Sequence, residues 1–449
     1  MNRFSGVLLI YVYIPVFTLF AILVGISPSI AYQSQRIEIP SSMNPVGSGA
    51  RALGMGGAFI AVADDATAAS WNPGGLIQLE TPEVSIVGAY FYRYDDNTFG
   101  SNPEASGPQD VSKETINYLS TAYPFNLFNR NMIISVNYQN LYDFSRNWKY
   151  SVNQESENLQ VYQDIDHTKE GGLSALGIAY CVQIFPEFSF GFTLNFWEDG
   201  IYPNGWEQTT KQEGTGKHFN DAFIFDSTST EKYEFSGFNI NLGILWNITN
   251  RFVFGAVLKT PFRAELKYTS SFNSETYYPD DSTVETSNPS PLDEDEKLNM
   301  PMSYGIGLSY RFSDKFTASA DIYRTEWEDY VLTDFTGQEV SPITGKPVAE
   351  SDISATTQVR LGIEHLLIAN KYVVPLRGGI FYDPAPADGE SDDFYGFSLG
   401  SGIAIGRFIF DLAYQYRFGN NVGTSIAENY NLSQDVKEHT AYASMIVHF

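Results

Sequence analysis

The chain has 449 residues, with 53 acidic side chains against 27 basic ones and a formal net charge of −26. This acidic balance argues against nucleic acid as a partner, because phosphate binding requires a basic surface. The single cysteine, Cys181, excludes an intrachain disulfide and any metal site built from several cysteines.

Residues 1–31 have the features of a secretory signal peptide. Arg3 precedes an apolar run from Val7 to Ile26, and the small residues Ser29 and Ala31 form a typical cleavage pattern. We expect cleavage after Ala31, with an uncleaved helical anchor as the alternative. No later run approaches about 20 apolar residues, so we expect no other membrane-spanning helix.

The stretch from Gly47 to Leu76 is rich in Gly and Ala and has little branched apolar mass. Its glycines between positions 54 and 57 permit tight turns and close approach to neighbouring walls. A short helix is predicted over 66–71, and Asn72-Pro73 would end it. We therefore expect residues 32–82 to pack inside a container formed by the remainder of the chain.

From Glu83 to the C-terminus, stretches of about ten residues alternate apolar and polar side chains, with turn signals between them. In one example, the apolar side chains from Phe188 to Phe196 point to one face while Ser189, Thr193 and Asn195 point to the other. Such alternation alone fits a soluble sandwich as well as a membrane barrel. The predicted strands are 83–93, 116–126, 132–148, 171–184, 188–198, 233–247, 252–268, 301–312, 316–331, 355–367, 372–383, 394–405, 407–419 and 438–449.

The connections between these strands separate the two folds. They alternate between short turns, such as 185–187, and long loops, such as 199–232, as expected when every second connection faces the periplasm. The last strand ends on Phe449, which is typical of an outer-membrane barrel. We therefore predict an all-β fold: a closed antiparallel transmembrane β-barrel of about 14 strands over residues 83–449, with the N-terminal stretch in its lumen.

Signals for catalysis or cofactor binding are missing from the sequence. The five histidines are scattered, and there is no GxSxG elbow, P-loop or dinucleotide-binding fingerprint. We predict no catalytic residues, no cofactor and no metal ligands, and an enzyme remains a minor alternative. The acidic loop 269–300 is interpreted as a solvated surface, with divalent-cation bridging to lipopolysaccharide as the alternative.

The motif GARALGMGGAFIAVADDATAASWNPGGL, from Gly49 to Leu76, resembles the N-terminal region of the FadL/TodX family of outer-membrane transporters. Asn72-Pro73 matches an Asn-Pro-Ala of that family, and Gly74 replaces the Ala. A weaker local match is LRGGIFYDPAP, from Leu376 to Pro386. The start of the motif is shared with PorV-like outer-membrane barrels.

The resemblance implies that residues 32–82 form a hatch inside a barrel of fourteen strands in the bacterial outer membrane. It implies facilitated diffusion of hydrophobic molecules, such as long-chain fatty acids or aromatic hydrocarbons. The alternative is a PorV-like scaffold barrel for a secretion or surface-attachment system. The expected partners are hydrophobic cargo, outer-membrane lipid and lipopolysaccharide, and we expect a monomer.

Family likeness also implies a gate in the hatch and an opening in the barrel wall near the third strand. The gate candidates are Asn72, Pro73 and Gly74. The third strand, predicted over 132–148, lacks the glycine that would favour a kink, so a bulge is expected within 137–141. The candidates for the wall opening are Asn137, Gln139 and Asn140.

Substrate-pocket candidates come from the hatch and from strand positions predicted to face the lumen. Phe59 and Trp71 belong to the hatch, where they line a pocket or only wedge the segment in place. Lys259, Arg360 and Arg377 lie at inward strand positions and would meet a carboxylate cargo. The alternative is that these cations pair with lumenal acids such as Asp411 or Glu364.

Overall fold

The computed structural model describes residues 47–219, 221–426 and 430–449, and the predicted signal peptide lies outside the described residues. The helices are short: α3 Ala50–Gly54, α4 Ala68–Trp71, η1 Pro73–Gln78, η2 Pro103–Ala105, η3 Trp327–Asp329 and η4 Val348–Glu350. The strands are β1 Glu83–Phe99, β2 Gly107–Leu127, β3 Arg130–Asp143, β4 Arg146–Glu155, β5 Leu159–Phe185, β6 Phe188–Trp197, β7 Gly205–His218, β8 Asp221–Asn247, β9 Phe252–Lys259, β10 Phe262–Tyr278, β11 Thr283–Ser287, β12 Leu292–Met300, β13 Ser303–Ser313, β14 Phe316–Thr325, β15 Val331–Thr333, β16 Glu339–Val340, β17 Thr356–Ile368, β18 Tyr372–Tyr382, β19 Tyr395–Ile405, β20 Phe408–Val422 and β21 Leu432–His448. Over the described ranges, no helix has both the length and the apolar character needed to cross a membrane.

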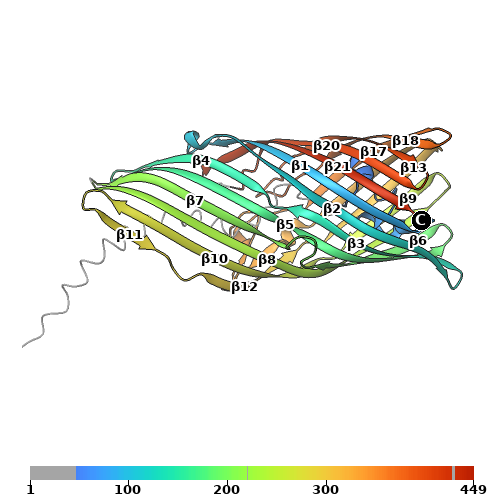
Figure 1. The fold of residues 1–449 in the computed structure, drawn as a ribbon, viewed down its shortest axis with the longest axis horizontal. Coiled ribbons are helices and arrows are strands. Elements are labelled where there is room, and N and C mark those ends of the chain that lie inside the picture. The colour runs from blue at the N-terminus through green and yellow to red at the C-terminus, as the bar shows by residue number, and fades with distance from the viewer. Residues whose placement is uncertain (1–46, 220, 427–429) are drawn as a thin grey trace, which may run out of the picture.

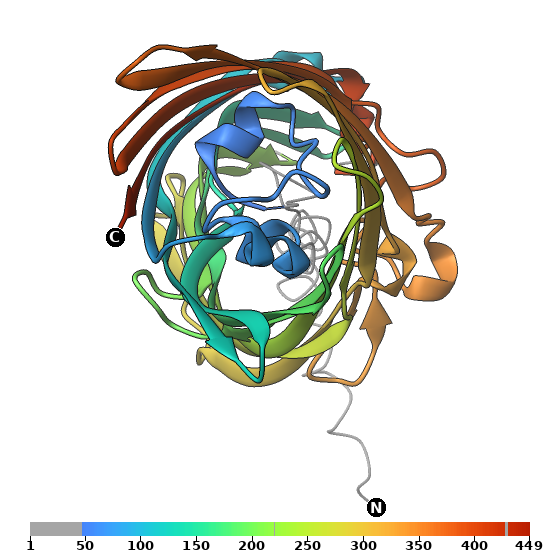
Figure 2. The same ribbon diagram turned by 90° about the vertical axis from the view of Figure 1, so that its right-hand side faces the viewer.

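The strands close into a ring (Figure 1, Figure 2). Each strand of the ring pairs antiparallel with its neighbours, and the last strand, β21, pairs with the first, β1, from Glu83↔His448 to Phe99↔Leu432. The prediction of a closed antiparallel barrel of about 14 strands is confirmed. Within the described residues, the order around the ring is β1, β2, β3, β5, β6, β8, β9, β13, β14, β17, β18, β19, β20 and β21.

One side of the barrel extends well beyond the ring. There β4, β7, β10, β12 and β15 continue the sheet, pairing in the order β4–β5–β7–β8–β10–β12–β15, and they form the long wall at the left of Figure 1. The prediction of long loops at 199–232 and 269–300 is therefore wrong, because most of both stretches is strand. The sequence of β7, GWEQTTKQEGTGKH, lacks the apolar/polar alternation of a membrane strand, so this part of the extension could not be recognised from its period.

The third predicted strand, 132–148, is also corrected by the structure. It is divided into β3 and β4, which are separated at Phe144 and Ser145. Phe144 is fully buried in an apolar cluster with Trp197, Trp206 and Tyr233. The strand breaks where the apolar side chain of Phe144 packs inward. The number of apolar residues in the stretch does not reveal this break.

Apolar side chains cover the outer face of the ring, as the alternation predicted. On β17 the outward Val359, Leu361 and Ile363 are 41%, 47% and 48% exposed, while the alternating Gln358 and Arg360 are buried. The apolar rows therefore face away from the lumen and are not enclosed between two sheets, which excludes the sandwich. An outer face of this kind is stable only in apolar surroundings.

The segment from Gly47 to Gln78 lies within the ring of strands (Figure 2). Glycines of the inner wall let its backbone approach the strands: a Cβ at Gly191 would lie 2.3 Å from the Pro73 carbonyl oxygen, and one at Gly379 would lie 2.3 Å from the Gly56 nitrogen. Similar close approaches define the set that we call the inner glycines: Gly191, Gly243, Gly255, Gly307, Gly362, Gly379 and Gly400. A side chain at these positions would displace the segment or bend the wall.

We predict that Gly379→Ala destabilises the protein while Gly378→Ala does not. A methyl group at Gly379 meets backbone atoms at 2.3–2.6 Å, whereas one at Gly378 meets nothing closer than 3.9 Å. Overpacking of this kind costs about 1–3 kcal/mol. Urea unfolding of the two purified variants, followed by tryptophan fluorescence, measures the difference; equal stabilities would show that the inner glycines do not limit the fit.

Candidate functional site

Polar side chains of the inner wall bind the backbone of the N-terminal segment. Asp321 on β14 accepts hydrogen bonds from the Phe59 and Ile60 nitrogens at 2.7 and 2.9 Å. Ser319 donates to the Ala58 carbonyl at 2.7 Å, and Thr193 donates to the Ala69 carbonyl at 2.8 Å. Because a buried backbone group without a partner is costly, these bonds are what allow an irregular segment to be buried in the lumen.

Asn72, Pro73 and Gly74, the predicted gate, form a hydrogen-bonded corner. The Asn72 side chain donates from Nδ2 to the carbonyls of Ile60, at 2.8 Å, and Ile244, at 2.9 Å, while its Oδ1 accepts from the Gly74 nitrogen at 3.0 Å. Asn72 thereby joins two parts of the segment to β8. The short helix α4 ends at Trp71, before Asn72-Pro73, as predicted, and Pro73 starts a separate 3-10 helix, η1. The corner packs against the wall. It does not line the cavity of about 880 Å³ above the N-terminal segment, which we call the main cavity.

A chain of largely buried ion pairs joins the segment to the neighbouring strands β17, β18 and β20. Arg51 in α3 pairs with Asp64 and with Glu364 on β17, the latter at 3.0 Å. Glu364 also accepts from Arg377 at 2.6 Å, and Arg377 reaches Asp411 at 2.6 Å. Arg377, a pocket candidate, is therefore engaged with the two lumenal acids that were its alternative partners, and it does not line the main cavity.

A second network of buried charges forms one wall of the cavity. Arg417 contacts Asp383 at 3.1 Å and Glu438 at 2.9 Å. Arg360 lies 3.6 Å from Asp383 and also donates to the Gly56 carbonyl at 3.1 Å. Arg360 does line the cavity, but as one member of a balanced set of opposite charges.

The main cavity has a volume of about 880 Å³ and lies above the N-terminal segment. Trp71, Leu53 and the glycines at 47, 49 and 57 form its floor. Trp71 is fixed there by a hydrogen bond from Nε1 to the Ser48 carbonyl at 2.6 Å. Aromatic rings supply much of the remaining apolar lining: Phe91, Tyr142, Tyr202, Trp206, Tyr233 and Tyr442.

Two other pocket candidates lie outside this lining. Phe59 is fully buried and contacts Trp71 edge to face, with ring centroids 5.8 Å apart, so it supports the floor from below. Lys259 lines a separate cavity of about 40 Å³, where its ammonium lies 5.9 Å from the Tyr323 ring. Strand parity placed Lys259 inward, and the hatch motif suggested Phe59, but neither argument could assign the side chain to a cavity.

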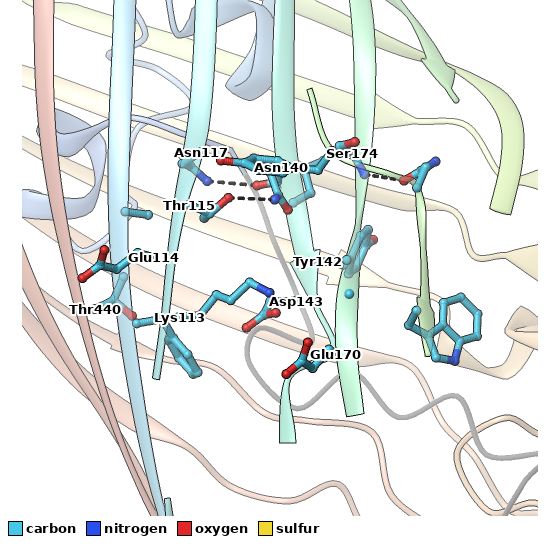
Figure 3. Close-up of a pocket in the computed structure, with 18 of the residues that line it drawn as sticks. Lys113, Glu114, Thr115, Asn117, Asn140, Tyr142, Asp143, Glu170, Ser174 and Thr440 are labelled. Atoms are coloured by element: carbon cyan, nitrogen blue, oxygen red, sulfur yellow. Dashed lines mark hydrogen bonds between the residues drawn. The ribbon is translucent and has the colours of Figure 1, made fainter. Parts of the chain in front are cut away.

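The cavity reaches the barrel wall where the pairing of β2 with β3 stops. The two strands pair from Leu127↔Arg130 up to Tyr118↔Gln139 and no further. Beyond that point, within the described residues, β2 pairs only with β1, and the end of β3 and β4 pair only with β5. Figure 3 shows the two strands diverging at this level.

A bulge on each strand marks the divergence. In the ladder of β2 with β1, Val87 faces Tyr118 and Gly88 faces Ile116, so Asn117 is the extra residue. In the ladder of β3 with β5, Leu141 is skipped between Asn140 and Tyr142. A β-bulge bends its strand and redirects the side chains beyond it, and two facing bulges therefore separate the strands.

Side chains close the two ends of the unpaired stretch. The lower end, which we define as the end nearer the N-terminal segment, is at the top of Figure 3. There Asn117 donates to the Asn140 carbonyl at 2.9 Å, and Asn140 donates to the Thr115 hydroxyl at 3.2 Å. At the upper end, the Gln109 amide donates to the Lys149 carbonyl at 2.7 Å and accepts from its nitrogen at 3.0 Å. Between them about 25 Å of strand, at the usual rise per residue, lacks ladder bonds; we call this unpaired stretch the window.

The predicted opening residues border the window from below. Asn140 forms its lower edge, and Gln139 forms the last ladder pair. Asn137 is buried two positions further down. The β2 contributors Gln109, Thr115 and Asn117 were missed, because a bulge changes the order of inward and outward residues by a single position, which sequence alternation scarcely records.

Comparison with known proteins gives a consistent result. A family model described as "Outer membrane protein transport protein (OMPP1/FadL/TodX)" matches residues 43–432. The fold is similar to a Pseudomonas aeruginosa FadL homologue, with a TM-score of 0.59 and 14% identity over 91% of this chain and 100% of that one. It is also similar to the Pseudomonas putida toluene transporter TodX, with a TM-score of 0.55 and 14% identity over 90% of this chain and 98% of that one. No individually curated protein matches the chain.

We predict that Asn72→Ala lowers the free energy of unfolding by about 3 kcal/mol, because it leaves two buried carbonyls without their donor. Asn72→Asp is expected to be worse, since a carboxylate would face the same two carbonyl oxygens. The exposed Asn158→Ala is the control. Urea titration of the three variants tests the order, and a tolerated Asn72→Asp would contradict the assigned hydrogen bonds.

Proposed function

Since the chain belongs to the family of outer-membrane transport proteins that includes FadL and TodX, we propose that it carries small hydrophobic molecules across the outer membrane by facilitated diffusion. Long-chain fatty acids and aromatic hydrocarbons are the candidate cargoes. Two similar structures, the toluene transporter TodX and the CymD monoaromatic hydrocarbon channel, bear names that point to the second class.

The observation that carries the proposal is the position of the window beside the main cavity. The N-terminal segment acts as a hatch, because it fills the lumen below the cavity and is bonded to strands on several sides. Cargo in the cavity therefore has no free path along the barrel axis. The window offers it a sideways path between β2 and β3.

Sideways release suits a cargo that is more stable in lipid than in water. The outward side chains change character at the level of the window. On β5 they are apolar at Leu176 and Ile178, which are 42% and 44% exposed, and acidic at Asp166 and Glu170. Cargo that leaves the window enters the edge of the apolar belt, where each buried CH₂ contributes about 0.8 kcal/mol. This gradient drives transport without nucleotide hydrolysis.

The scaffold alternative predicts a lumen in which no apolar pocket reaches the hatch. The cavity extends down to Trp71 and Leu53, and it carries six further aromatic rings. A protein that served only to hold a partner would have no use for such a lining. The cavity therefore favours transport.

We predict that blocking the window abolishes uptake. In Thr115→Cys the new thiol lies at the lower edge of the window, and the native Cys181 is fully buried and hydrogen-bonded to the Gly74 carbonyl. Modification of the new thiol with a bulky maleimide should lower uptake of radiolabelled toluene or oleate by host cells at least about tenfold, which corresponds to a barrier of roughly 1.4 kcal/mol.

The control is Gln160→Cys, an exposed position on the outer face of β5 that does not line the cavity. Labelling there should leave uptake unchanged. Full uptake after complete labelling at position 115 would exclude the window as the exit.

A further inference from the structure

The charges around the window differ from those deeper in the cavity. We propose, on the basis of the transport function above, that this rim makes the route selective for charge: it favours positively charged aromatic amphiphiles over uncharged ones, and it disfavours carboxylates relative to both. The inference concerns which cargo passes and not whether transport occurs.

Acidic side chains outnumber basic ones at the rim. The cations of the lining on this side are Lys113 and Lys232. The carboxylates come from five elements of the wall and the 198–204 connection, and they are Glu114, Asp143, Glu170, Asp199, Glu207 and Glu234. We call these residues the acidic rim.

Both rim cations are already close to an acid. Lys232 contacts Glu234 at 2.6 Å. Lys113 extends across the window toward Asp143 (Figure 3). A carboxylate that entered the window would therefore have to displace a protein carboxylate before it gained a cationic partner.

Three acids of the rim remain available to a ligand. Across the described part of the chain, neither a salt bridge nor a side-chain hydrogen bond is found for Glu114, Glu170 or Glu207, and all three line the cavity. Glu114 is on β2, Glu170 on β5 and Glu207 on β7, so they border the window from both sides. Glu207 faces Lys232 across the β7–β8 ladder, but that lysine already contacts Glu234, so the acidic rim keeps an excess of negative charge.

The deep wall of the cavity adds no preference for anions. Its cations, Arg360 and Arg417, contact Asp383 and Glu438. Partly buried aromatic rings such as those of Phe91 and Tyr142 line the space between this balanced wall and the acidic rim. Aromatic faces attract cations as well as apolar groups, so the site as a whole is suited to an aryl group that bears an amine.

The experiment uses three probes with the same carbon skeleton and different head groups: phenylpropylamine, phenylpropanol and phenylpropionate. Equilibrium dialysis at neutral pH measures the affinity of the purified full-length chain in detergent for each radiolabelled probe. We expect the amine to bind about fivefold more tightly than the alcohol, the size of effect that a few partly screened charges produce. The propionate should bind most weakly.

The test variant replaces the three available acids together: Glu114→Gln, Glu170→Gln and Glu207→Gln. It should abolish the preference for the amine and leave the affinity for the alcohol unchanged, which also shows that the variant is folded. The matched control removes three exposed acids of β10 and β12 that do not line the cavity: Glu275→Gln, Glu294→Gln and Asp295→Asn. This control should retain the preference.

Each result decides the question. If the propionate binds as tightly as the amine, or if the test variant behaves like the control, the charge selectivity is refuted while the transport function stands. If none of the three probes binds, the selectivity is refuted and the transport function loses its support as well.

Discussion

The structure depends on satisfying the backbone of an irregular segment inside a closed barrel. Water is largely displaced from that space, so a carbonyl or amide of the segment that is not paired within the segment requires a partner from the wall. The inner glycines remove side chains from the contact, and Asp321, Ser319 and Thr193 supply donors and acceptors at that surface. The N-terminal segment and the strand sequences are therefore matched position by position.

Under the proposed function, the filled lumen restricts where a solute can leave. Ion pairs from Arg51 to Glu364 and onward to Arg377 hold the segment to the wall, and breaking one partner of a buried pair is costly. A path along the axis would require many such contacts to separate together. The window requires no such change, because Asn117 and Leu141 have already separated β2 from β3.

The same window gives the site its chemical character. Above the apolar belt the wall is polar and acidic, whereas the cavity behind it is aromatic. A molecule that passes therefore meets charge at the rim and rings behind it within a short distance. Under the proposed function, hydrophobicity accounts for the final step into lipid, and under the proposed selectivity the charges at the rim discriminate among cargoes of equal hydrophobicity.

The sequence by itself determined the class of fold, because lipid imposes a strict alternation on each membrane strand and closure imposes an even number of strands. It also identified the segment from Gly47 to Leu76 as one suited to close packing. It did not reveal the strands of the extension, whose polar faces carry no period, or the division of the third strand at Phe144. Only the tertiary structure decided which inward cations reach the cavity: Arg360 does, while Arg377 is paired and Lys259 lies elsewhere. The bulge at Leu141 lies within the stretch 137–141, where one was expected from the sequence. The facing bulge at Asn117 and the extent of the window came only from the tertiary structure, because a one-residue bulge leaves almost no trace in composition, yet it changes which backbone groups can pair.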